Sequence, residues 1–279
     1  MKLPILSLST FLLAGVAFSP IMSMAQNTDG YKDTPLVPGT KWHVHDPDRP
    51  QPVKVTAPGC LTTQPPSDAE ILFNGTSTDA WQPSPNKPTE KYKPRMWPIK
   101  DGIWVDSYNS IETKKGYGDC QLHIEWRVPI SRSASGQRGA NSGVMFMGGR
   151  YEIQVLESHS NITYADGTAG AIYGQFPPMV NPALPKGEWQ SYDIAFVAPR
   201  FDKDGKLISP AKFTVLFNGV LVQNAQELLG PTTWKNVPPW KAHPERLPLI
   251  LQFHGDPIEF RNIWIRDLEK DAKASEESK

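Results

Sequence analysis

Three side chains with hydrogen-bonding or acid–base chemistry lie within one short predicted strand, YEIQVLES at residues 151–158. In strict alternation Glu152 and Gln154 share one face of this strand, whereas Glu157 falls on the more apolar face. Because a buried charge on an apolar face is costly, we expect a one-residue bulge that brings Glu157 round to Glu152. Two carboxyl groups gathered in this way can supply the acid and the base or nucleophile for glycosidic bond cleavage.

Further candidate site residues lie on other predicted strands and loops. His254 follows Gln252 by two residues in LPLILQFHG, so both side chains face the same way, and His254 is a candidate catalytic residue. Arg261 in EFRNIW could clamp a sugar oxygen or neutralise Glu259. The other candidate binding residues are Gln154, Asn141, Glu125 and Tyr173. Each also has a structural alternative as a hydrogen-bonded, ion-paired or core residue.

Composition limits the classes of partner. The 279 residues include 29 basic and 29 acidic side chains, and this balance argues against a nucleic-acid or anionic-membrane partner. The two cysteines, Cys60 and Cys120, lack the closely spaced partners of a cysteine metal site, and they either form one disulfide or stay free. The sequence leaves the metal ligands unknown, although oxygen ligands from separate strands could hold a divalent cation such as Ca²⁺.

The N-terminus has the pattern of an export signal. Lys2 precedes an apolar run from Ile5 to Phe18, and Ser23 and Ala25 are small residues positioned for cleavage after Ala25. The run is too short to span a bilayer comfortably. We therefore expect residues 1–25 to be a signal peptide and the protein to be periplasmic or secreted, with no membrane partner.

The rest of the chain divides by pattern. Residues 26–69 are rich in proline and predict an extended arm or linker, and Trp42 favours an arm because an aromatic side chain needs a surface to pack on. Residues 70–268 contain short strands separated by Gly, Pro and Asn turns, which predicts an all-β sandwich or barrel. In QLHIEWRVP at 121–129 apolar and polar residues alternate, so one sheet surface should face solvent. Residues 269–279 read as a charged tail.

Five ordered stretches resemble a known family. They are ANSGVMFMGGRYEIQVLES, YADGTAGAIYGQFPPMVNP, GEWQSYDIAFVAPRF, FTVLFNGVLVQN and LQFHGDPIEFRNIWIRDL. Together, from about Ile71 to Leu268, they resemble the 3-keto-disaccharide hydrolase family. The resemblance implies a concanavalin A-like jelly-roll β-sandwich in an exported protein. Retaining glucanases of that fold carry Glu-x-Asp-x-x-Glu, and here Gln154 stands in place of the aspartate.

The resemblance also implies a reaction on 3-keto-glycosides. A ketone at C3 acidifies the C2 proton, so that a base removes this proton, the group on C1 leaves by elimination, and water adds back. Glu152 or Glu157 could be the base, Arg261 or a metal held by carboxylates and His254 could stabilise the enolate, and His254 could instead protonate the leaving oxygen. The implied partners are a glycoside or oligosaccharide substrate and a sugar 3-dehydrogenase. Two alternatives stay open: a lectin-like carbohydrate-binding module, and a direct retaining glycosidase.

Overall fold

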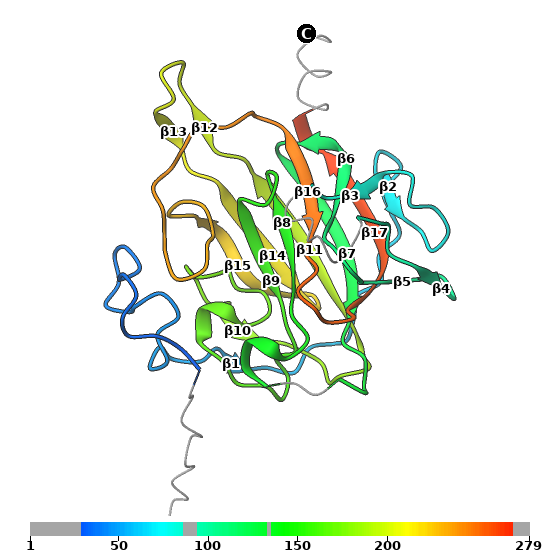
Figure 1. Ribbon diagram of the computed structural model, residues 1–279, viewed down its shortest axis with the longest axis horizontal. Coiled ribbons are helices and arrows are strands. Elements are labelled where there is room, and N and C mark those ends of the chain that lie inside the picture. Colours follow the sequence, from blue (N-terminus) through cyan, green and yellow to red (C-terminus); the bar gives the residue numbers. More distant parts are fainter. Residues whose placement is uncertain (1–28, 86–93, 133–134, 270–279) are drawn as a thin grey trace, which may run out of the picture.

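The computed structural model describes residues 29–85, 94–132 and 135–269 (Figure 1). The predicted signal peptide, residues 1–25, and the tail beyond Glu269 lie outside these residues. Among the described residues, none belongs to a helix with the length and hydrophobicity needed to traverse a bilayer.

Nearly all regular structure in the described residues is β. The elements are β1 (Val53–Lys54), β2 (Glu70–Phe73), β3 (Trp81–Pro83), β4 (Ile99–Lys100), β5 (Ile103–Val105), β6 (Ile111–Tyr117), β7 (Cys120–Arg127), the 3₁₀ turn η1 (Gly136–Arg138), β8 (Ser142–Phe146), β9 (Tyr151–Val155), the 3₁₀ turn η2 (Ala165–Gly167), β10 (Val180–Asn181), β11 (Trp189–Val197), β12 (Arg200–Phe201), β13 (Leu207–Ser209), β14 (Lys212–Phe217), β15 (Val220–Glu227), β16 (Leu247–Leu251) and β17 (Glu259–Asp267).

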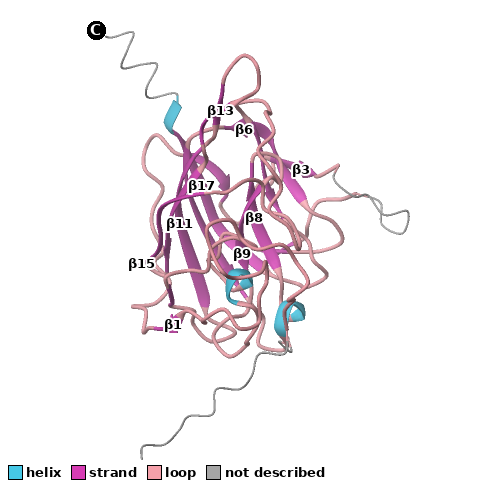
Figure 2. Ribbon diagram, turned by 90° about the vertical axis from the view of Figure 1, so that its left-hand side faces the viewer, coloured by secondary structure: helices cyan, strands magenta, loops and turns pink. Residues whose placement is uncertain are grey.

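Two sheets form the two layers of the molecule (Figure 2). The larger sheet has the strand order β15-β14-β11-β7-β17-β5-β4, with β2 also paired to β17. The smaller sheet has the order β3-β6-β16-β8-β9, and its recorded pairs are antiparallel. The predicted all-β jelly-roll sandwich is confirmed.

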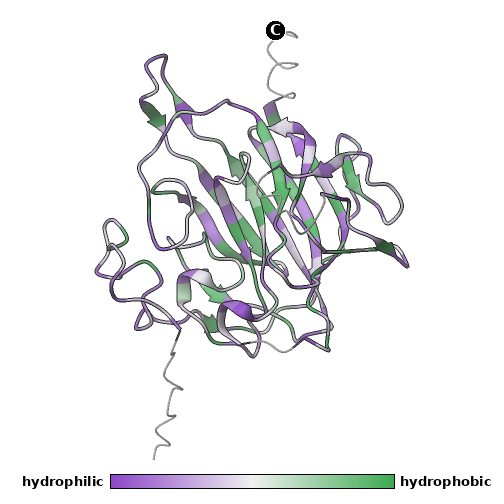
Figure 3. Ribbon diagram, in the orientation of Figure 1, coloured by the Kyte–Doolittle hydropathy of each residue, from purple (hydrophilic) through white to green (hydrophobic). Residues whose placement is uncertain are grey.

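Aromatic and aliphatic side chains fill the space between the sheets. Along the strands hydrophobic residues alternate with hydrophilic ones (Figure 3). Phe146 of β8 joins the layers, since its ring centroid lies 4.8 Å from that of Phe196 on β11 and 5.1 Å from that of Phe213 on β14. All three side chains are buried, and burying each contributes roughly 1.5–3 kcal/mol to the free energy of unfolding.

Tight turns set the register of the hairpins. Asn218 and Gly219 connect β14 to β15 with φ values of 51° and 78°, as the predicted two-residue turn requires. Residues 147–150 connect β8 to β9, and the first three of them also have positive φ values. This second hairpin is the one that carries the candidate catalytic strand.

The N-terminal arm covers the outer face of β7. Leu61 N donates to Ser191 Oγ (3.1 Å), and the Thr63 hydroxyl lies 3.1 Å from His123 Nδ1. His123 and Glu125 are fully buried as a result. The prediction that this polar face meets solvent is therefore wrong at these positions, because the arm lies over it. Cys60 in this arm and Cys120 on β7 are both free thiols.

Candidate active site

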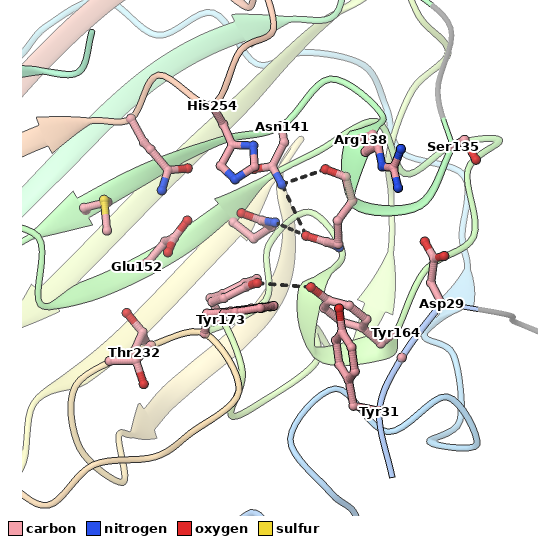
Figure 4. Close-up of a pocket in the computed structure, with 17 residues that line it drawn as sticks. Asp29, Tyr31, Ser135, Arg138, Asn141, Glu152, Tyr164, Tyr173, Thr232 and His254 are labelled. Carbon is pink, nitrogen blue, oxygen red and sulfur yellow. Dashed lines mark hydrogen bonds between the residues drawn. The ribbon is translucent and has the colours of Figure 1, made fainter. Parts of the chain in front are cut away.

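A cavity of about 1010 Å³ lies beside the smaller sheet (Figure 4). Its floor includes Glu152 and Gln154 of β9 and Met145 of β8. Its walls come from separate segments of the chain, namely 29–31 of the arm, 135–141 around η1, 164–173 around η2, 232–234, and 252–254 after β16. This volume is at the upper end of the range of about 300–1,000 Å³ that is usual for ligand pockets.

Strand β9 delivers two polar side chains to this cavity by simple alternation. Its five residues pair one-to-one with β8, without a bulge. Tyr151, Ile153 and Val155 join the apolar core, so Glu152 and Gln154 point the other way, into the cavity. The expected bulge in this strand is therefore wrong.

Glu157 lies past the end of β9 and does not line this cavity. Its carboxylate accepts hydrogen bonds from the backbone N–H groups of His159 (2.8 Å) and Ser160 (2.9 Å) and from the Ser160 hydroxyl (3.2 Å). These bonds stabilise the turn that follows the strand. The expectation that Glu157 joins Glu152 is corrected: the chain leaves the sheet before Glu157 instead of rotating it by a bulge.

Glu152 is a mostly buried acid whose side chain lines the cavity. Only 6% of its surface is exposed, and burial raises the pKa of its carboxyl to about 8. In the part of the chain that the structure describes, no Lys, Arg or His lies within ion-pair distance of it. Gly143 of β8 makes room for Glu152, because a Cβ atom at position 143 would lie 2.3 Å from Glu152 Oε1.

Gln154 contacts Glu152 through one end of its amide. That end lies 3.2 Å from Glu152 Oε1 and 3.0 Å from the Ser142 carbonyl oxygen, and the other end lies 3.0 Å from Gln137 Oε1. Because the Ser142 carbonyl can only accept, the amide nitrogen belongs at this end, where it can also donate to ionised Glu152. An aspartate here would instead repel ionised Glu152.

Other polar groups predicted from the sequence line the same cavity. The Asn141 amide donates to Gln137 O (3.0 Å), and the Tyr173 and Tyr164 hydroxyls lie 3.1 Å apart. The backbone N–H of Tyr173 donates to Glu152 O (3.2 Å), which holds the loop against β9. His254 is exposed at the rim. The structure therefore brings together Glu152, Gln154, Asn141, Tyr173 and His254.

Glu125 and Arg261 lie outside the cavity, in a cluster on the larger sheet. Glu125 accepts hydrogen bonds from Arg261 Nε (2.6 Å) and Asn262 Nδ2 (2.8 Å). Burial alone would raise the pKa of Glu125, but hydrogen bonds from His123, Asn262 and Arg261 outweigh burial and lower it to about 2. A register shift in β17 between Arg261 and Trp264 lets neighbouring residues reach the same acid. Both residues fit a structural ion pair under the arm, and their expected place in the site is corrected.

Several residues that line the cavity were not predicted from the sequence, and Arg138 and Tyr31 are two of them. Arg138 ends η1 and lines the cavity, and among the described residues no carboxylate lies within ion-pair distance of its guanidinium. Tyr31 of the arm also lines the cavity. Arg138 lies in a short 3₁₀ turn and Tyr31 in the arm, where no strand periodicity indicates the direction of a side chain. The flanking glycines of SGQRG signal only a turn.

A buried ion pair fixes the arm beside the cavity. Asp166 of η2 accepts from His45 N (3.0 Å), lies 3.1 Å from His45 Nδ1, and lies 3.6 Å from the Arg49 guanidinium. The His45 ring stacks on Tyr164 with ring centroids 4.0 Å apart. This set of contacts connects the arm to a loop that forms the cavity wall.

We expect Asp166→Asn to loosen the arm and to lower the free energy of unfolding by about 3 kcal/mol, because the amide leaves buried partners without their acceptor. Limited proteolysis should then cut within residues 29–69 faster, and thermal unfolding should report the lost stability. Asp48→Asn is the matched control, since its ion pair with Lys32 is exposed and solvent screens such a pair. Equal protease resistance of Asp166→Asn and the unsubstituted protein would contradict this role.

The structure does not identify metal ligands. Within residues 29–85, 94–132 and 135–269, no three His, Cys, Asp or Glu side chains form a group that could hold a metal ion. The Ca²⁺ hypothesis remains a prediction.

The chain is similar to known proteins. Residues 68–266 match the 3-keto-alpha-glucoside-1,2-lyase-like domain. A crystal structure of a proposed glycosyl hydrolase from Parabacteroides distasonis is similar, with a TM-score of 0.67 and 40% identity over 78% of this chain and 92% of that chain. A second proposed glycosyl hydrolase from the same organism has a TM-score of 0.49 and 21% identity, over 72% of this chain and 94% of that chain. No curated protein matches the chain. Because the matching domain spans well over half of its residues, the protein belongs to the family of 3-keto-alpha-glucoside-1,2-lyase-like domains.

Proposed function

We propose that the protein cleaves 3-keto-glycosides by elimination followed by hydration, with Glu152 as the base. The observation that carries this proposal is a nearly buried carboxyl that faces a large cavity and has no cationic partner among the described residues. A base whose pKa lies near the working pH combines a usable ionised fraction with a strong pull on the substrate proton. The raised pKa of Glu152, about 8, meets this condition.

The reaction uses three groups around C1, C2 and C3. Glu152 takes the C2 proton, and the electron pair forms an enolate with the C3 ketone. The enolate collapses to expel the group on C1, whose oxygen takes a proton from His254, and a C1–C2 double bond remains. Water then adds at C1 and gives a proton to His254, while Glu152 returns its solvent-exchangeable proton to C2, so the sum is one water consumed and one glycosidic bond cleaved.

The negative charge that develops on the C3 oxygen must be stabilised by hydrogen-bond donors that are already in position before the reaction. The Tyr173 and Tyr164 hydroxyls and the Asn141 amide line the cavity with the base. Arg138 supplies a cation at the same cavity without a carboxylate partner in the described part of the chain. These groups take the enolate-stabilising role that the sequence suggested for Arg261.

The direct glycosidase route receives less support from the same geometry. It needs a second carboxyl about 5–10 Å from the first, across the glycosidic bond. Glu157 stabilises a turn outside the cavity, and Asp29, which does line it, lies at the other end of the cavity from Glu152 (Figure 4). A lectin-like module would not need a buried acid with a raised pKa on its binding surface.

The test is to incubate the purified protein with a 3-keto-glycoside and, separately, with its unoxidised parent. Elimination predicts cleavage of the keto sugar alone, because only its C2 proton is acidified. Cleavage of the parent would indicate the direct route, and binding without cleavage of either would indicate a lectin-like module. Repeating the assay after EDTA treatment, with Ca²⁺ added back, tests the proposed cation.

We also propose that the protein is exported, with a sugar 3-dehydrogenase as the functional partner that supplies the C3 ketone. Expression in a bacterium should give a periplasmic or secreted chain that begins at Gln26, as N-terminal sequencing would show. Ala25→Leu should retain the signal, because cleavage needs a small residue at that position. A cytoplasmic chain with residues 1–25 still attached would contradict export.

A further inference from the structure

One tryptophan at the cavity is exposed to solvent instead of being packed in the hydrophobic core. Trp234 leaves 64% of its surface in solvent and lines the same cavity as Glu152. Its ring meets Tyr31 of the arm edge-on, with ring centroids 6.3 Å apart at 87°. Large apolar side chains left exposed beside a cavity are typical of ligand-binding surfaces.

The aromatic side chains form a series that leads away from the catalytic acid. Tyr173 lies beside Glu152 and contacts the Tyr164 hydroxyl at 3.1 Å. Tyr164 and Tyr31 follow with ring centroids 6.4 Å apart, and Trp234 comes last. Tyr164 is buried, Tyr31 is half-buried and Trp234 is exposed, so this outer part of the series runs to the cavity rim. A substrate seated on Glu152 would therefore extend its remaining part towards Tyr31 and Trp234.

The segment that carries Trp234 is held in place. Thr232 N and Oγ1 both donate to Arg150 O, at 2.8 and 3.1 Å, and the Thr233 hydroxyl donates to Asn236 O at 2.9 Å. The Lys235 ammonium lies 3.4 Å from the Tyr31 ring centroid and 4.7 Å from that of Trp234, so a cation–π contact bridges the two rings. The surface is therefore preorganised before any ligand binds.

We propose that Tyr31 and Trp234 form a binding subsite for the leaving group of the glycoside and select leaving groups that contain a ring. Rings of sugars and aromatic groups both have a flat face that can stack on an indole, whereas a methyl group has none. This inference rests on the proposed function, since it takes Glu152 as the reacting end of the cavity. It assigns the N-terminal arm a direct part in substrate selection.

The test compares three ligands: 3-keto methyl glucoside, 3-keto phenyl glucoside and a 3-keto-disaccharide. Binding is measured by calorimetry on Glu152→Gln protein, which holds each ligand uncleaved. We expect Trp234→Ala to weaken binding of one or both ring-bearing ligands about tenfold, and that of the methyl glucoside less than twofold. The ligand with the larger loss shows whether a sugar or an aromatic ring is preferred.

Two controls make the result specific. Trp234→Phe should restore most of the lost affinity, because it keeps a ring at the rim. Ile208→Ala on β13, which removes another exposed apolar side chain (67% exposed), should leave all three affinities unchanged. Equal losses for the methyl and ring-bearing ligands, or no loss for any, would overturn the subsite. If the unsubstituted protein cleaves no keto sugar, the proposed function fails, and the binding comparison still decides the subsite.

Discussion

Glu152→Gln should lower kcat for a 3-keto-glycoside by about 10²–10⁴-fold, the usual contribution of a general base. Glutamine has nearly the same shape and keeps the hydrogen bonds that an amide can make, but it cannot accept the C2 proton. The affinity for the keto sugar should therefore change little. Single-turnover cleavage assays and calorimetric binding would separate the two quantities.

The matched control is Glu157→Gln, on the same stretch of sequence. It weakens the turn after β9, because the amide can no longer accept from all its present donors, and about 1 kcal/mol of stability should be lost. Its kcat should stay within about twofold of the unsubstituted value, since the side chain lies outside the cavity. Equal losses of kcat in both variants would contradict the division of roles between these two acids.

The pH dependence follows from the raised pKa of Glu152. Because the base must be ionised, the ascending limb of the pH profile of kcat/KM should have its midpoint near pH 8. Stability should change in the opposite direction. The folded protein keeps its proton up to about pH 8 while the unfolded chain loses it near 4.5, so the free energy of unfolding falls as pH rises between these values. Glu152→Gln should remove this decrease, which thermal unfolding at several pH values would show.

Gly143→Ala should lower kcat by about 10–100-fold without unfolding the protein. A Cβ atom at position 143 would lie 2.3 Å from Glu152 Oε1 and 2.9 Å from its Cδ, so the carboxyl must move. The Glu152 side chain can rotate away at small cost, but displacing a reacting group by about 1 Å is enough to cost about 10²-fold in rate. Cleavage kinetics and thermal unfolding would show whether catalysis falls while stability is kept.

The chain offers a close control for this substitution. At Gly118 an added Cβ would also meet a flexible carboxylate, Glu269 Oε1 at 2.5 Å, but Gly118 does not line the cavity. Gly118→Ala should therefore leave the rate of cleavage unchanged. If it lowers the rate as much as Gly143→Ala, the effect arises from general strain in the sheets rather than from Glu152.

The sequence predicted features that local patterns determine. The alternation in 121–129 and the Asn218-Gly219 turn each correspond to observed strands and a hairpin, because side-chain period and turn geometry are local. The direction of Glu152 and Gln154 also followed from alternation. The direction of the Glu157 side chain did not follow from alternation, because a bulge before Glu157 and a strand that ends before Glu157 are both consistent with the same sequence.

Long-range packing limited the rest of the prediction. Glu125 and Arg261 looked like open binding groups, but the arm segment around Thr63 covers this face of the sheet. Arg138 lies in a 3₁₀ turn and Trp234 in a loop, and contacts with distant residues such as Arg150 hold the Trp234 segment in place. No sequence period encodes such contacts, so the walls of the cavity became visible only in the folded chain.

The most direct test of the central claim, that Glu152 removes the C2 proton of the sugar, is cleavage of a 3-keto-glycoside in D₂O. We expect deuterium at C2 of the released keto sugar, above the level found when the free product is incubated alone, and a loss of both cleavage and this label in Glu152→Gln. A product cleaved at the normal rate that retains its original C2 hydrogen would contradict it.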